Sequence, residues 1–229
     1  MISAIRFLFI SLTTIVAITA AMIYRLFSGS SKGPVRWAHT WWAPWVLWFA
    51  GIKIKVEGLE NFDPKKYYVF ISNHQSYIDI PVAFAALPTN LHFVAKSELK
   101  KFPFIGQYMM LMGMIFIERK SSKAIESLQK AGELIRNGKS VFTFPEGTRT
   151  SNGEIGAFKK GTFLLAAASG VEIVPIKIEG ARAVWPKERV HLTPGIITLK
   201  VGKPVPSTHI TKENVGEVCK EMRALVAAL

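Results

Sequence analysis

A histidine and an aspartate five positions apart are the first side chains in this 229-residue chain whose types and spacing suit acid–base chemistry. His74 and Asp79 lie in the segment NHQSYID, directly after the apolar run 67–71. On one regular helix, residues five apart point about 140° away from each other, so a turn between a strand and a helix is the better setting. In such a turn the Asp79 carboxylate would reach the imidazole, fix its tautomer and leave the other ring nitrogen as a base.

The same aspartate also has an ordinary structural role open to it. Asp79 can cap the helix that follows, and Pro81 fits the first turn of that helix. The alternative to a catalytic pair is therefore a capping aspartate beside an unrelated histidine. The residue types alone leave both interpretations open.

Two further segments place charge directly after an apolar run. In FPEGTRT, Gly147 permits close backbone approach, while Arg149 and free backbone N–H groups suit a phosphate. The alternative is a polar turn with a surface ion pair. The segment GMIFIER reads as a strand that ends in Arg119, which on its own is more typical of a solvated strand end.

The elements that must position these residues are short strands separated by helical patterns. Helices are predicted over 125–135, over 163–169 and over 211–229. Pro175 predicts an edge or a break in its strand. This alternation predicts an α/β domain over residues 51–229, with a largely parallel sheet flanked by helices. The predicted strands are 52–56, 67–71, 91–95, 114–117, 141–144, 172–178 and 196–201.

Residues 1–50 differ from the rest and predict a pair of apolar helices. Residues 7–24 carry no charge, and as a helix they would reach about 27 Å, barely the thickness of a hydrocarbon core. A polar linker follows, and then a second uncharged stretch, 37–52, which Pro44 should kink. Four tryptophans of this stretch step by helical intervals and should share one face, as in a membrane interface: Trp37, Trp41, Trp45 and Trp48.

Three interpretations of this pair compete. A cleaved signal peptide would leave the tryptophan-rich segment unexplained. A pair of ordinary core helices is the second interpretation. The favoured one is a membrane-embedded hairpin, and because basic residues flank both segments, their charges do not decide between spanning the bilayer and lying in one leaflet.

Charge and cysteine content narrow the classes of partner. Lysine and arginine total 29 against 16 aspartate and glutamate, a formal net charge of +13. Such a surplus indicates an anionic partner, whether nucleic acid, an anionic membrane or a phosphorylated substrate. The single cysteine, Cys219, excludes an internal disulfide framework and a multi-cysteine metal site, and we expect it to serve in packing.

The order of the blocks NHQSYID, GMIFIER, FPEGTRT and VPI resembles the glycerolipid acyltransferases, and the whole chain resembles the bacterial 1-acyl-sn-glycerol-3-phosphate acyltransferases. Lys96, Phe158 and Gly161 also fit this pattern, and Thr150 stands where many members have serine. The resemblance implies the glycerolipid acyltransferase fold and a membrane-embedded helix pair. It implies acyl transfer from a thioester to the sn-2 hydroxyl of lysophosphatidic acid, giving phosphatidic acid for phospholipid biosynthesis.

In that reaction His74 would act as general base and Asp79 would orient it, with direct transfer and no acyl-enzyme. Ser76 is a much less favoured alternative as a nucleophile. The resemblance implies that Arg119, Glu146 and Arg149 hold the glycerol phosphate, with Gly147 and Thr148 in the same loop and Lys96 as a weaker phosphate ligand.

The implied partners are the lipid bilayer, a lysophospholipid acceptor and an acyl-CoA or acyl carrier protein donor. No metal, bound cofactor or nucleic acid is expected. Because both donors are cytosolic, the site should face the cytoplasm from the bacterial inner membrane. The alternatives are an acyltransferase for another lysophospholipid or for glycerol 3-phosphate, a membrane-bound lipid hydrolase, and a non-enzymatic membrane or nucleic-acid binder.

Overall fold

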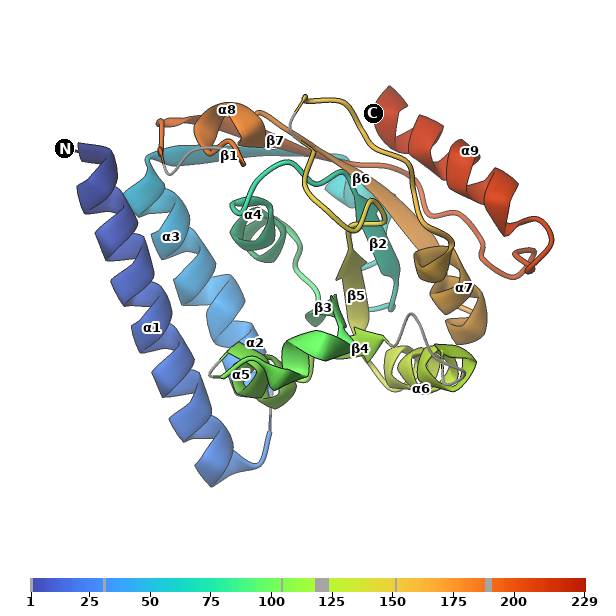
Figure 1. The fold of residues 1–229 in the computed structure, drawn as a ribbon, viewed down its shortest axis with the longest axis horizontal. Coiled ribbons are helices and arrows are strands. Elements are labelled where there is room, and N and C mark those ends of the chain that lie inside the picture. The colour runs from blue at the N-terminus through green and yellow to red at the C-terminus, as the bar shows by residue number, and fades with distance from the viewer. Residues whose placement is uncertain (1, 31, 104, 118–123, 151, 188–190) are drawn as a thin grey trace.

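The computed structural model describes residues 2–30, 32–103, 105–117, 124–150, 152–187 and 191–229. Its centre is a seven-stranded sheet in the order β1-β7-β6-β2-β5-β3-β4 (Figure 1). Neighbouring strands pair in parallel except β6 and β7, which are antiparallel. The predicted α/β fold with a largely parallel sheet is confirmed. The strands are β1 (Ile52–Glu57), β2 (Val69–Ser72), β3 (Leu91–Lys96), β4 (Ile115–Ile117), β5 (Ser140–Thr143), β6 (Ile173–Glu179) and β7 (Gly195–Val201).

Pro175 lies at a break in a central strand and not at an edge of the sheet. β6 pairs with β2 on one side, and its antiparallel ladder to β7 begins only at Ile176. Beyond the gap an isolated bridge joins Ile173 to Val205. Pro175 has no N–H to donate, and it lies where β6 has no regular ladder partner on the β7 side. Of the two predicted positions for Pro175, an edge strand or a break in the ladder, the structure confirms the break.

Helices cover both faces of the sheet (Figure 1). On one face α4 (Asp79–Ala86) lies between the sheet and the N-terminal helices. On the other face α6 (Ala124–Arg136), α7 (Lys160–Ser169) and α9 (Val215–Ala228) pack together. Each face has its own apolar cluster, and Cys219 is buried in the cluster under α9, so its packing role is confirmed. The short helices are α5 (Ile105–Leu111) and α8 (Ala181–Val184), with 3-10 turns η2 (Leu59–Asn61) and η3 (Ser97–Lys101).

The first fifty residues form a helical hairpin. After α1 (Ile2–Ser28) the chain continues through α2 (Lys32–Trp37), a π-helical segment η1 (Ala38–Trp42) and α3 (Ala43–Ala50). Pro44 lies at the start of α3, where it cannot donate the N–H that a continuous α-helix needs. The kink predicted at Pro44 therefore takes the form of a π-helical segment immediately before it.

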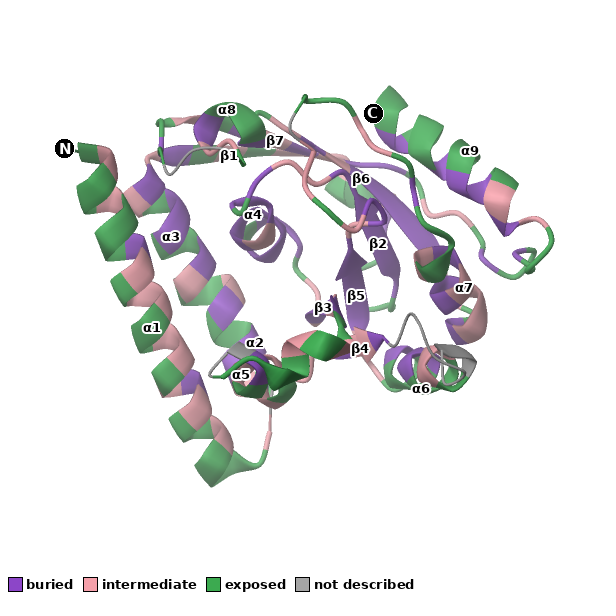
Figure 2. Cartoon of the chain, in the orientation of Figure 1, coloured by how far each residue is buried: buried purple, intermediate pink, exposed green. Residues whose placement is uncertain are grey.

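The hairpin has a buried inner side and an exposed apolar outer side. α3 buries Val46, Leu47 and Ala50 in the same cluster as residues of α4 and the sheet. Among the described residues, α1 is the one helix that is long and apolar enough to cross a membrane. Only 11% of its most apolar 18-residue stretch is buried against the rest of the protein (Figure 2). Each of the four tryptophans of the predicted face is exposed: Trp37, Trp41, Trp45 and Trp48.

Candidate active site

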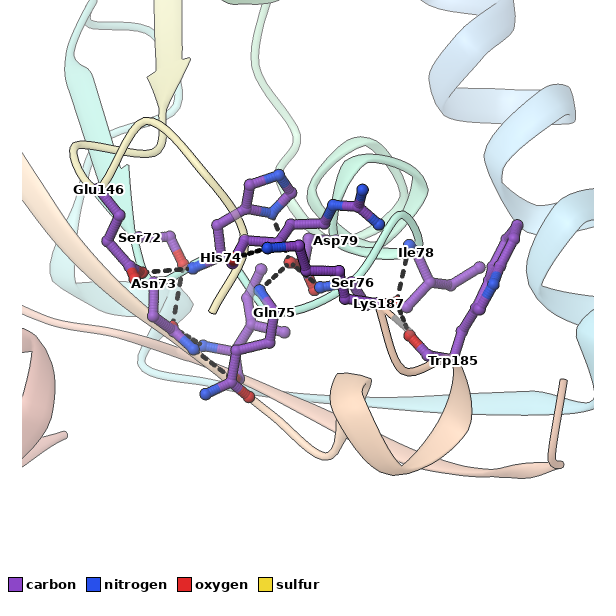
Figure 3. A network of polar contacts seen from close by, with 12 residues as sticks. Ser72, Asn73, His74, Gln75, Ser76, Ile78, Asp79, Glu146, Trp185 and Lys187 are labelled. Carbon is purple, nitrogen blue, oxygen red and sulfur yellow. Dashed lines mark hydrogen bonds and ion pairs between the residues drawn. The ribbon is translucent and has the colours of Figure 1, made fainter. Parts of the chain in front are cut away.

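His74 and Asp79 meet directly beyond the carboxyl end of β2. The Nδ1 atom of His74 lies 2.8 Å from Oδ2 of Asp79, the first residue of α4. The same Oδ2 atom accepts the backbone N–H groups of Gln75 and Ser76, each at 2.9 Å (Figure 3). One carboxylate oxygen therefore fixes both the imidazole and the backbone of the turn that carries it.

The predicted capping role of Asp79 is wrong. The N-cap residue of α4 is Ile78, which forms no side-chain capping hydrogen bond, and Asp79 is the first helical residue. The Asp79 carboxylate accepts hydrogen bonds from backbone N–H groups that precede the helix. Its Oδ2 atom is already occupied by three donors that precede the helix, so it does not serve the free N–H groups of the first helical turn. The carboxylate organises the catalytic turn instead of the helix.

These contacts assign the tautomer of His74. A buried carboxylate accepts hydrogen bonds, so Nδ1 carries the proton and Nε2 is left as the proton acceptor. The side chain of His74 is 17% exposed, so a substrate can reach it, whereas that of Asp79 is buried. The imidazole stacks on Phe144, with ring centroids 3.9 Å apart, and this stacking fixes the ring plane.

Glu146 holds the catalytic turn from the side opposite Asp79. Its Oε1 atom accepts the His74 N–H at 2.7 Å, and its Oε2 atom accepts the Gly156 N–H at 2.9 Å. The N–H of Thr150 donates to the His74 carbonyl at 3.0 Å. Burial raises the pKa of Glu146, while the two backbone N–H groups oppose that rise. Both carboxylate oxygens of Glu146 therefore bind backbone N–H groups, those of His74 and Gly156. The predicted contact of Glu146 with the acceptor stays a prediction.

Arg149 lies beside the same turn. Gly147 adopts a positive φ of 69°, and its N–H closes a turn onto the Phe144 carbonyl. This turn leads into the exposed Thr148 and then Arg149. The Arg149 guanidinium stacks on Tyr77, with Cζ 3.5 Å from the ring centroid, and its Nη1 atom is buried without a hydrogen-bond partner among the described residues. The structure thus brings a base and an unsatisfied cation to one edge of the sheet.

The remaining predicted phosphate ligands belong to the outer strands. Lys96 is exposed at the end of β3, where it pairs with Ile117, the last residue of β4. Arg119 lies outside the described residues. Because the strand order is β2-β5-β3 and neighbouring strands are about 4.8 Å apart, the carboxyl ends of these three parallel strands lie side by side along one edge of the sheet.

Several residues that shape the site had no role assigned from sequence. The Asn73 side chain exchanges two hydrogen bonds with the backbone of Ile178, and so ties the end of β2 to β6. The Ser76 hydroxyl is buried and donates to the Trp185 carbonyl at 2.7 Å, while Lys187 donates to the Arg149 carbonyl. Asn73 is adjacent to His74 in the sequence, and this position could have pointed to a role in the site. Trp185 and Lys187 lie more than a hundred residues from Ser76 and belong to no recognisable motif.

A family model described as "Acyltransferase" matches residues 53–179 of the chain, more than half of its length. This range contains His74, Asp79 and the whole loop around Glu146 and Arg149. The chain belongs to the acyltransferase family.

Other acyltransferases resemble the chain over most of its length. It is 37% identical over 179 residues to the chloroplast 1-acyl-sn-glycerol-3-phosphate acyltransferase of Arabidopsis thaliana, covering 76% of this chain and 48% of that protein. The 1-acyl-sn-glycerol-3-phosphate acyltransferase of Saccharomyces cerevisiae is 36% identical, and the match covers 76% of this chain and 58% of that protein. The 1-acyl-sn-glycerol-3-phosphate acyltransferase alpha of Homo sapiens is 34% identical, and the match covers 78% of this chain and 64% of that protein. The chain thus spans about half to two thirds of these relatives.

A solved acyltransferase structure has the same fold. The crystal structure of the 1-acyl-sn-glycerophosphate acyltransferase PlsC from Thermotoga maritima matches with a TM-score of 0.75 and 27% sequence identity. The match covers 99% of this chain and 95% of that one, so it includes the N-terminal hairpin as well as the α/β body.

Substitutions of the acid–base pair of this acyltransferase test the site. We expect His74→Ala to remove nearly all acyl transfer, because Nε2 of His74 is the proton acceptor assigned to this site. Asp79→Asn should lower the rate by on the order of 10³–10⁴, as in serine proteases, because an amide can hold the wrong tautomer. Transfer rates of the purified variants check this, with circular dichroism as the control for folding. Near-normal turnover by a folded His74→Ala protein would contradict the assignment.

Proposed function

We propose that the protein transfers a fatty acyl group from an acyl thioester to the sn-2 hydroxyl of lysophosphatidic acid, giving phosphatidic acid. The observation that carries this proposal is that one edge of the sheet holds both His74, whose Nδ1 is bound by Asp79, and Arg149, whose Nη1 lacks a hydrogen-bond partner among the described residues. A base and an anion ligand are what a phosphorylated alcohol needs as an acceptor. The names of the acyltransferases described above support the choice of acceptor.

The proposed transfer is direct. Nε2 of His74 accepts the proton of the acceptor hydroxyl as that oxygen attacks the thioester carbonyl carbon. The tetrahedral intermediate collapses with cleavage of the C–S bond, and the thiolate takes the proton from the imidazolium. Asp79 stabilises the imidazolium while it exists. Ser76 takes no part as a nucleophile, because its hydroxyl is buried and donates to Trp185.

The acceptor phosphate is proposed to bind at Arg149. No described carboxylate forms an ion pair with the Arg149 guanidinium, and a phosphate oxygen at its accessible edge would supply a charge-assisted hydrogen bond. Lys96, the last residue of β3, would add positive charge at the same edge, and Arg119 is proposed as a further phosphate ligand. The donor is proposed to be acyl-CoA or acyl carrier protein. The steps above need only a base and an activated acyl group, so no metal or bound cofactor takes part in them.

The hairpin is proposed to embed in the bacterial inner membrane, with the active site facing the cytoplasm. The side chains of α1 are mostly exposed and apolar, as a lipid environment would allow. Between α1 and the α2–α3 segment lies an apolar groove of about 490 Å³, lined by Trp37, Trp41 and Trp45 among others. A long acyl chain gains about 0.8 kcal/mol for each CH₂ kept in an apolar phase, so membrane contact suits both the acceptor and the product.

The deciding experiment is an assay of the purified full-length protein with lysophosphatidic acid and each thioester donor. Formation of phosphatidic acid supports the proposal. Release of free fatty acid alone would identify a hydrolase, and a preference for another lysolipid would change the acceptor.

Substitution of the arginines tests the acceptor site. We expect Arg149→Lys and Arg119→Ala to raise the KM for lysophosphatidic acid far more than the KM for the donor, because lysine replaces a bidentate arginine poorly. The matched control is Arg136→Lys, an exposed arginine on α6 at the other face of the sheet. Equal losses for both substrates would mean that these arginines support only the fold.

Membrane extraction tests the role of the hairpin. We expect the full-length protein to stay in membranes at roughly 1 M salt, where surface electrostatics is screened within about 3 Å, and to be released by detergent. Trp41→Ser combined with Trp48→Ser should weaken this retention, because these side chains are 63% and 69% exposed. Leu225→Ser, an exposed apolar position on α9, is the control. Release by salt alone would show that the hairpin is not embedded.

A further inference from the structure

Tyr77 is an aromatic side chain in the middle of the catalytic turn that does not serve the core. Its side chain is 53% exposed, although in the sequence it lies between His74 and Asp79, which are joined by a hydrogen bond. Its ring instead faces the Arg149 guanidinium, whose Cζ atom lies 3.5 Å from the ring centroid. At this distance the two groups are in van der Waals contact in a cation–π arrangement.

The ring of Tyr77 is a stacking partner of the Arg149 guanidinium. Among the described residues no carboxylate forms an ion pair with this guanidinium, and its Nη1 atom lacks a hydrogen-bond partner. Stacking uses the face of the guanidinium and leaves its N–H groups free at the edges. The guanidinium is therefore held in place with its donors available to a ligand.

Trp185 supports Tyr77 from behind. The two rings are tilted by 51° with centroids 5.5 Å apart, and the Trp185 carbonyl accepts the Ser76 hydroxyl at 2.7 Å. Lys187, two residues later, donates to the Arg149 carbonyl at 2.9 Å. The segment that follows α8 thus touches both halves of the site, the catalytic turn and the arginine loop (Figure 3).

The first helix of the hairpin reaches this segment. Phe7 of α1 packs edge-on against Trp185, with ring centroids 6.0 Å apart and planes at 86°. Ser3 accepts the Leu192 N–H at 2.8 Å, which gives α1 a second contact with the chain beyond α8. A continuous series of ring contacts therefore runs from the apolar hairpin to the arginine: Phe7, Trp185, Tyr77 and Arg149.

We propose that Tyr77 and Trp185 are positioning residues that hold Arg149 ready for the acceptor phosphate, and that Phe7 links this arrangement to the hairpin. The inference rests on the proposed function, because the phosphate at Arg149 is that of the proposed acceptor. Its consequence is that α1 supports acceptor binding through Trp185 and Tyr77, in addition to any contact with lipid.

The test compares Tyr77→Leu, which removes the ring, with Tyr77→Phe, which keeps it. The full-length protein is assayed in detergent with a short-chain, water-soluble lysophosphatidic acid, so that membrane partition does not enter. We expect Tyr77→Leu to raise the acceptor KM by roughly three- to tenfold with little change in donor KM or kcat. Tyr77→Phe should be close to the unsubstituted protein. The control is Tyr67→Leu, an exposed tyrosine immediately before β2, at the opposite edge of the sheet.

A double-mutant cycle shows whether Tyr77 acts through Arg149. In an Arg149→Gln background, Tyr77→Leu should raise the acceptor KM no further, because the guanidinium that it positions is gone. Trp185→Leu and Phe7→Leu should give smaller increases of the same kind, each lost in the same background. Additive effects, or equal losses for donor and acceptor, would overturn the inference.

A binding measurement separates this inference from the proposed reaction. Glycerol 3-phosphate should raise the melting temperature of the unsubstituted protein and of Tyr77→Phe, and should do so less for Tyr77→Leu and for Arg149→Gln. If this pattern appears without acyl transfer to lysophosphatidic acid, the proposed function fails and the role of Tyr77 stands. If transfer occurs but Tyr77→Leu behaves like Tyr77→Phe in both measurements, the inference fails alone.

Discussion

The site depends on the hydrogen bonds that one buried carboxylate oxygen accepts. Asp79 is buried, and an isolated carboxylate in such a place would be strongly destabilising. Three donors offset part of that cost at Oδ2, namely the imidazole of His74 and the backbone N–H groups of Gln75 and Ser76, while Oδ1 has no hydrogen-bond partner among the described residues. With all three donors pointing at Asp79, Nδ1 of His74 is occupied and Nε2 is the nitrogen left to accept a proton.

The sheet supplies the second constraint. β5 is the neighbour of β2, so the loop after β5 is delivered to the turn after β2 although 72 residues separate Glu146 from His74. Two carboxylates then bracket the histidine, Asp79 on its ring and Glu146 on its backbone. Gly156 is required on the far side of Glu146, because a Cβ there would lie 2.8 Å from Oε2. Two adjacent parallel strands thus bring His74 and Arg149, the proposed base and the proposed anion ligand, to the same edge of the sheet.

Much of this arrangement follows from the sequence, and what does not has identifiable reasons. Apolar runs such as 67–71 and 141–144 reveal buried strands, and the polar blocks after them reveal the edge where the site forms. The same runs carry no direction, so the antiparallel pairing of β6 with β7 could not be predicted from them. The roles of Asp79 and Glu146 toward backbone N–H groups were also hidden, because every residue except proline carries such a donor. Contacts between distant segments, such as Trp185 with Ser76, leave no local pattern.

The central claim is that Asp79 sets the tautomer of His74, and nitrogen NMR of the imidazole tests it most directly. In full-length protein with ¹⁵N-labelled histidine, the expected spectrum of the neutral His74 imidazole has a proton on Nδ1 and an unprotonated Nε2. The signal is assigned by its loss in His74→Ala. A neutral His74 with its proton on Nε2 would contradict the account, because the nitrogen that faces the substrate would then have no lone pair to accept a proton.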